Sequence, residues 1–80
     1  MGHYRLELRS AGRGVTVWIF LAPSDEAAAL TGPYRCQADL WPDGTAWEVS
    51  RYDPLTVDAD GQTATAACIG NMVGSGEYER

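Results

Sequence analysis

The feature that most constrains the fold is a pair of adjacent segments with strand character near the N-terminus. In "HYRLELR", residues 3–9, polar and apolar residues alternate, so that Tyr4, Leu6 and Leu8 share one face. "VTVWIFL", residues 15–21, is β-branched and aromatic and is apolar on both faces, which is typical of a strand inside a sheet. The glycine-rich turn "SAGRG" joins the two segments, so the sequence predicts an antiparallel hairpin.

The next segment, "APSDEAAALTG", interrupts the strand pattern and predicts a short helix over about residues 25–31. Ser24 is a favourable N-cap, and Asp25 and Glu26 suit the positive end of the helix dipole. Three alanines favour the helix itself. Gly32, followed by a proline, predicts that the helix ends there.

A second hairpin is predicted around the turn Pro42-Asp43-Gly44, where proline presets the first turn dihedral and glycine can adopt a positive φ. Before this turn, "YRCQADLW", residues 34–41, alternates as a strand does. After it, "TAWEVSRY", residues 45–52, is expected to return as the partner strand, with Trp47 and Val49 facing inward. The inner face of the first strand would hold Tyr34, Cys36, Ala38 and Leu40.

The last third of the chain is less regular. Residues 54–59, "PLTVDA", can form a short fifth strand. Residues 62–72 fit a helix capped by Asp60, although "TATAACI" also fits a strand. Residues 74–80 are expected to be a mobile tail. The sequence therefore predicts one α+β domain over residues 1–80, with a four- to five-stranded antiparallel sheet and one or two short helices on one face.

The charge distribution is uneven. The net charge is −5, and all six basic residues are arginines. Residues 39–80 hold two arginines against eight acidic residues, so the negative charge is concentrated in the second half. Direct binding to nucleic acid is not expected, because such binding depends on neutralising phosphates. The N-terminus lacks the apolar core of a signal peptide and no apolar run reaches the roughly 20 residues of a membrane helix, so we expect a cytoplasmic protein.

A cation-binding loop is the first alternative for the acidic stretch "YDPLTVDADG", residues 52–61. "DADG" is similar to half of a calcium-binding EF-hand loop, with Asp58 and Asp60 at the first and third ligand positions. The twelfth position, which needs a bidentate glutamate, holds Ile69. Capping of a helix accounts for Asp60 and could extend to Asp58, but it does not account for Asp53. We therefore expect neither a metal ion nor another cofactor.

No motif in the chain predicts catalysis. "GRG" is too short for a phosphate-binding loop, and no serine stands in a GxSxG setting. The two cysteines, Cys36 and Cys68, form no CxxC pair, and without a secretion signal we expect them to be free and buried. The sequence therefore indicates a protein that is not an enzyme.

Taken together, the chain resembles the anti-CRISPR proteins, which are small, acidic, single-domain inhibitors carried by bacteriophages and mobile elements. The shared features are about eighty residues, the lack of a catalytic motif, a pI near 4.5, hairpins with short helices, and clustered Asp and Glu. The group has no common motif, but the segment "LTVDADGQTATAA" resembles strand-to-helix segments of small phage-type domains. The resemblance implies a non-enzymatic inhibitor. Such a protein would bind the basic DNA-contacting surface of a type I CRISPR surveillance complex (Cascade), or its recruited nuclease.

On this interpretation, a basic subunit of a CRISPR-Cas effector is the expected partner, and Trp41 and Tyr52 are expected apolar anchors beside the acidic residues. The alternative is a self-associating structural or accessory module of a phage or bacterial complex, which pairs through a sheet edge. The oligomeric state is accordingly open between monomer and homodimer. The carboxylates expected to contact the partner are Asp39, Asp43, Glu48, Asp53, Asp58, Asp60, Glu77 and Glu79.

Overall fold

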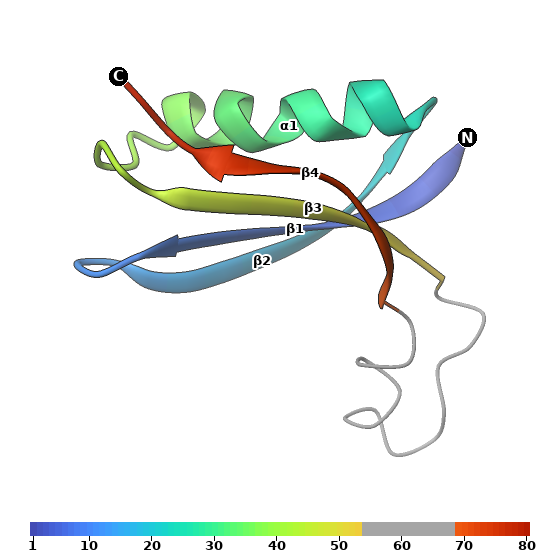
Figure 1. The fold of residues 1–80 in the computed structure, drawn as a ribbon, viewed down its shortest axis with the longest axis horizontal. Helices are drawn as coiled ribbons and strands as arrows, with labels where there is room; N and C mark the ends of the chain where they lie inside the picture. The colour runs from blue at the N-terminus through green and yellow to red at the C-terminus, as the bar shows by residue number, and fades with distance from the viewer. Residues whose placement is uncertain (54–68) are drawn as a thin grey trace, which may run out of the picture.

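The computed structural model describes residues 1–53 and 69–80, and it has the predicted α+β class: a four-stranded antiparallel sheet with one helix packed against it (Figure 1). The strand order is β2-β1-β3-β4, so β2 and β4 are the two edges. The elements in chain order are β1 (Gly2–Ser10), β2 (Gly14–Ala22), α1 (Asp25–Ala38), β3 (Ala46–Tyr52) and β4 (Ile69–Glu77).

The first hairpin is confirmed. β1 and β2 pair antiparallel without interruption, from Gly2 opposite Ala22 to Ser10 opposite Gly14. The alternation in β1 has the expected result, because its three apolar residues, Tyr4, Leu6 and Leu8, are all buried. The interior position expected for residues 15–21 is wrong, since β2 is an edge strand and its outward-facing side chains are exposed.

The helix starts where the sequence predicts but is longer. The Ser24 hydroxyl accepts a hydrogen bond from the Ala27 N–H at 3.2 Å, which is the expected N-cap. Gly32 does not end the helix. A Cβ at this position would lie 2.2 Å from the ring of Trp47, so the glycine allows α1 to approach β3 closely. The predicted stop was therefore a packing position.

The strand predicted for residues 34–41 is wrong, because residues 34–38 are the last turn of α1. Ala28, Gly32 and Cys36 are buried, and their spacing of four is the helical period. The helix ends at Ala38 with Asp39 as its C-cap, and the next residue, Leu40, has a φ of 56°, the left-handed conformation that glycine usually supplies. The Trp41 N–H donates to the Cys36 carbonyl at 2.9 Å across this turn.

The turn at residues 42–44 is present, but it joins α1 to β3 and not two strands, so the second hairpin is wrong. The Thr45 N–H donates to the Pro42 carbonyl at 3.2 Å, and Gly44 has the expected positive φ, 86°. The strand after the turn is confirmed as β3, in which Val49 is fully buried.

The C-terminal residues are part of the fold, so the expected mobile tail at residues 74–80 is wrong. Residues up to Glu77 belong to β4. Beyond the strand, the Tyr78 N–H donates to the Thr45 carbonyl at 2.7 Å, and the Gly44 N–H donates to the Tyr78 carbonyl at 2.8 Å. Tyr78 also packs against the core.

The predicted helix over residues 62–72 is wrong for Ile69–Met72, which begin β4. Its remaining part, residues 62–68, and the proposed fifth strand, residues 54–59, lie outside the described residues. A glycine again explains a close approach: a Cβ on Gly74 of β4 would lie 2.8 Å from the Ala29 Cβ of α1.

The core lies between the helix and the inner face of the sheet. α1 packs mainly over β3 and β4, and it is furthest from β2 (Figure 1). Cys36 is buried with a free thiol, as expected, and this burial raises its pKa. The other cysteine, Cys68, lies outside the described residues. Within residues 1–53 and 69–80, no helix is long and apolar enough to cross a membrane. The largest fully buried side chains are Trp41, Leu6, Leu8, Val49, Thr45 and Cys36.

Candidate protein-binding surfaces

Half of the eight predicted carboxylates lie at one end of the molecule, which we call the acidic end: Asp39, Asp43, Glu77 and Glu79. The loop between α1 and β3 and the C-terminal residues meet there (Figure 1). The Asp43 carboxylate accepts the backbone N–H of Arg80 at 2.8 Å, which ties the loop to the C-terminus directly. Asp39 is half-buried and the other three residues are exposed.

An arginine from the first hairpin holds this end together. The Arg13 guanidinium donates to the backbone carbonyls of Asp39 and Leu40, at 3.0 and 3.3 Å. The same guanidinium lies 3.9 Å from the centre of the Trp41 ring, a favourable cation–π distance. The loop that carries two of the four carboxylates is therefore bound to the β1–β2 turn as well as to the C-terminus.

Of the other predicted carboxylates that the structure describes, Glu48 lies near this end. It is on the sheet face away from α1, opposite Glu7 on one side and Ser75 on the other, and Glu77 is two residues beyond Ser75 on the same face. Asp53 follows the far end of β3, about 20 Å from its start at roughly 3.3 Å per residue. This separation exceeds the Debye length of about 8 Å at physiological salt. Asp58 and Asp60 lie outside the described residues. The described carboxylates thus form the acidic end with Glu48 beside it, and Asp53 occupies a separate position.

The two predicted aromatic anchors differ in exposure. Trp41 was expected on the outer face of a strand, which is wrong: it is 1% exposed and lies beneath Arg13. The reason is that Trp41 follows the helix, and the turn at Leu40 directs the chain back over the core. Tyr52 is half-buried at the end of β3 and lines a cavity there.

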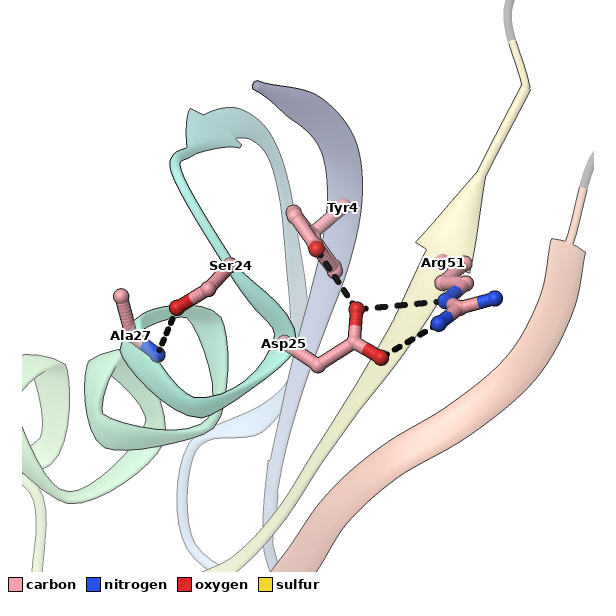
Figure 2. Close-up of polar contacts among 5 residues, drawn as sticks. All are labelled: Tyr4, Ser24, Asp25, Ala27 and Arg51. Carbon is pink, nitrogen blue, oxygen red and sulfur yellow. Dashed lines mark hydrogen bonds and ion pairs between the residues drawn. The ribbon is translucent and has the colours of Figure 1, made fainter.

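Next to this cavity, three side chains from three elements meet, and sequence reasoning had not singled them out (Figure 2). The Tyr4 hydroxyl of β1 donates to Asp25 Oδ1 at 2.7 Å. Arg51 of β3 donates to the same carboxylate through both Nε, at 3.2 Å, and Nη2. Asp25 is the first residue of α1, so the cluster fastens the start of the helix to the two central strands.

The charges in this cluster favour a fixed structural role. Hydrogen bonds from Arg51 and Tyr4 lower the pKa of Asp25, and the hydrogen bond to Asp25 raises the pKa of Tyr4. The hydrogen bond to Asp25 and the charge of Asp25 raise the pKa of Arg51. Each group therefore holds its ordinary charge state near neutral pH more firmly. A general acid or base needs the opposite, a pKa close to the working pH.

The adjoining cavity has a volume of about 600 Å³ and is lined by residues from the start of β1, the start of α1 and the end of β3. His3, Ser24 and Tyr52 are among them. The Ser24 hydroxyl is engaged as the N-cap of α1. No hydrogen bond links it to His3 in the described residues, so the described lining contains no nucleophile–base pair.

Sequence reasoning also missed an exposed aliphatic row on β2, which we call the β2 stripe: Val15, Val17, Ile19 and Leu21. These four side chains point away from α1 and are 42–56% exposed. The signal was in the sequence, because residues 15–21 are apolar on both faces. The expected position inside the sheet accounted for that pattern without an exposed row.

No group of three or more potential metal ligands occurs in the part of the chain that the structure describes. Comparison of the chain with models of protein families, with curated proteins and with solved structures found no match. The functional assignment consequently depends on the surfaces described above.

Proposed function

We propose that the protein is a non-enzymatic inhibitor of the anti-CRISPR type, which binds the basic DNA-contacting surface of a type I surveillance complex through its acidic end. The observation that carries the proposal is the grouping of Asp39, Asp43, Glu77 and Glu79 at one end of the fold. These residues are up to forty positions apart in the chain, and backbone hydrogen bonds between the loop and the C-terminus bring them together.

Two further features support an electrostatic role for this end. α1 ends there, and the C-terminus of a helix carries a partial negative charge that adds to that of the carboxylates. Arg13, the arginine bound to this loop, directs its guanidinium to backbone carbonyls and to the Trp41 ring. Within the described residues, Arg13 makes no ion pair with the four carboxylates of the acidic end.

An ordered acidic surface can occupy positions in a basic channel that otherwise hold the phosphates of target DNA. Electrostatic complementarity of this kind mainly increases the association rate and makes binding sensitive to salt. The proposal therefore implies that inhibition weakens as ionic strength rises. The self-associating alternative concerns a different surface, the sheet edge formed by β2.

The test is competition for DNA binding with a purified type I surveillance complex that carries its guide RNA. Binding of labelled target DNA is measured with increasing amounts of the protein, at low and at high salt. The triple variant Asp43→Lys/Glu77→Lys/Glu79→Lys should lose inhibition, because it reverses the three exposed carboxylates of the acidic end. Asp39 is kept because it is half-buried and is the C-cap of α1.

Glu26→Lys is the matched control, since it reverses an exposed carboxylate at the other end of α1. It should retain inhibition. A separate variant with Asp53, Asp58 and Asp60 changed to lysine tests whether the second acidic segment contributes. Full inhibition by both triple variants, each shown to be folded by circular dichroism, would rule out an acidic binding surface.

A further inference from the structure

Among residues 1–53 and 69–80, the β2 edge of the sheet has none of the common protections against pairing with another chain. Edge strands expose unpaired backbone N–H and C=O groups, and proteins usually protect them with charged residues, proline, bulges or a covering element. β2 spans nine residues without a charge or a proline, and its pairing with β1 has no bulge. α1 lies over the opposite side of the sheet and leaves this edge open (Figure 1).

On the outer face of the sheet, the charged residues lie on a central strand and the apolar residues lie on an edge strand, which is an unusual arrangement. On β1, which is a central strand, Arg5, Glu7 and Arg9 form a charged row linked by ion pairs of 3.2 and 3.1 Å. The β2 stripe lies directly beside this row, with Val17 opposite Glu7 and Ile19 opposite Arg5. Solvent-exposed edges ordinarily carry the charges. The reversed order indicates that the β2 edge is covered in the functional state.

We propose that β2 pairs antiparallel with β2 of a second copy of the chain, so that two four-stranded sheets become one continuous eight-stranded sheet. The inference is independent of the function proposed above, because it concerns a different surface. A two-fold axis at Trp18, the middle residue of β2, would place Val15 opposite Leu21 and Val17 opposite Ile19 of the other copy. All pairs in the β2 stripe are then aliphatic.

This arrangement also fits the composition of the strand. "VTVWIFL" has the sequence of an internal strand, and pairing with a second copy makes β2 internal. The β2 stripes of the two copies would form one apolar surface across the dimer axis. On the inner face, the Trp18 side chains would meet at the axis; each is half-buried in the single chain, beneath the Arg35 guanidinium at 5.1 Å.

A second copy suits this surface better than an unrelated chain because β2 is self-complementary. It carries no charge that would need an opposite charge, and within the β2 stripe the axis matches aliphatic residues with aliphatic residues. The strand offers nine residues, fewer than the roughly 20–30 per partner of stable interfaces. We therefore expect a reversible dimer whose population depends on protein concentration.

The test measures both the mass of the protein in solution and the location of the contact between the two copies. Sedimentation velocity over a wide concentration range should show a shift from monomer to dimer. Hydrogen exchange at the same concentrations should show slower exchange of β2 amides as the dimer forms, with β4 amides unchanged. Val17→Lys/Ile19→Lys places lysine pairs across the axis and should weaken dimerisation by on the order of 100-fold or more.

The matched control is Leu30→Lys/Tyr34→Lys on α1, which replaces two exposed apolar residues and adds the same charge. It should dimerise as the unchanged chain does. A chain that stays monomeric at all concentrations would overturn the proposal. So would a dimer that persists in Val17→Lys/Ile19→Lys, or one that forms without protecting the β2 amides. Circular dichroism of each variant shows that it is folded.

Discussion

The two edges of the sheet are built in opposite ways. β4 carries glycines at three positions, Gly70, Gly74 and Gly76, and its pairing with β3 has two register shifts. α1 packs against it closely enough that Gly74 has no room for a Cβ. β2 has an uninterrupted register and large side chains on both faces, and among the described strands it is the one that α1 contacts least.

The comparison shows two kinds of edge strand: one protected from further pairing by its irregular backbone register, and one whose regular backbone is free to pair with another chain. Irregular pairing and close helix packing make β4 a poor template for a further strand. β2 offers a regular ladder and an aliphatic surface. The protein thus has one edge closed by its own helix and one edge that its own residues leave open.

The largest effect is expected from Gly74→Val, which would break the closed edge. The added side chain would meet Ala29 of α1, and overpacking of this kind costs about 2–3 kcal/mol of the free energy of unfolding. Urea denaturation measures the change. Gly12→Val is the matched control, because a Cβ on Gly12 meets nothing within 4 Å, and its effect should stay within about 0.5 kcal/mol. An unchanged urea midpoint for Gly74→Val would contradict the close packing of α1 on β4.

A smaller effect is expected where α1 reaches toward the open edge. Arg35→Ala removes the guanidinium above Trp18 and should cost about 1 kcal/mol. A double-mutant cycle with Trp18→Leu isolates the pair and should give a coupling energy of about 0.5–1 kcal/mol. The cycle should be measured by urea denaturation in the Val17→Lys/Ile19→Lys background, because dimerisation makes apparent stability depend on concentration. Additive effects of the two substitutions would show that α1 has no energetic link to β2.

A third prediction concerns the ion pair that fastens α1 to the central strands, and it is expressed as pH dependence. The pKa of Asp25 is lowered in the folded protein, so its contribution to stability is complete above the ordinary value of 3.8 and is lost as the pH falls through the lowered value. Asp25→Asn should remove this component of the acid-induced loss. Both charged side chains are about half exposed, so the effect is expected to be small.

The measurement is the urea midpoint between neutral pH and pH 2 for the unchanged chain and for Asp25→Asn. Glu26→Gln is the control, because it removes the neighbouring carboxyl and keeps Asp25 with its partners Tyr4 and Arg51. It should retain the acid-range slope that Asp25→Asn loses. Equal slopes in all three proteins would show that the cluster in Figure 2 does not stabilise the fold.

The smallest effect is expected from Ser75→Val, which makes the outer face of β4 more apolar. Ser75 is exposed and lies opposite Glu48. Because the irregular register and the helix protect this edge, we expect no new association and a stability change within about 0.5 kcal/mol. Light scattering at high concentration measures the mass in the Val17→Lys/Ile19→Lys background. Association of the Ser75→Val protein would mean that an apolar residue on an edge strand is sufficient for self-association.

Local sequence signals predicted the elements whose residues act within a few positions of one another. The alternation of Tyr4, Leu6 and Leu8 predicted both β1 and its buried face. The N-cap at Ser24 predicted the start of α1. The turn at residues 42–44 was also predicted, because proline and glycine set its dihedrals directly.

The errors arose where a residue serves a distant partner. Gly32 has the sequence character of a helix stop, yet its place in the fold is set by the ring of Trp47, fifteen positions away. Residues 74–80 have the composition of a tail, yet Gly74 packs on Ala29 and Tyr78 bonds to Thr45. The four carboxylates of the acidic end were predicted as partner-binding residues, but their clustering at one end was not. They come together only because the loop after α1 forms hydrogen bonds with the C-terminal residues.

Periodicity, capping and composition are enough to predict the α+β class, the first hairpin, the helix start and the excess of negative charge in the second half. All of these are local properties of the chain. The strand order, which makes β2 one edge and β4 the opposite edge, follows from long-range packing. Strand order depends on contacts between residues that are distant in the sequence. The residues of β2 are typical of an internal strand, so its position at an edge is known only once the neighbouring strands are placed.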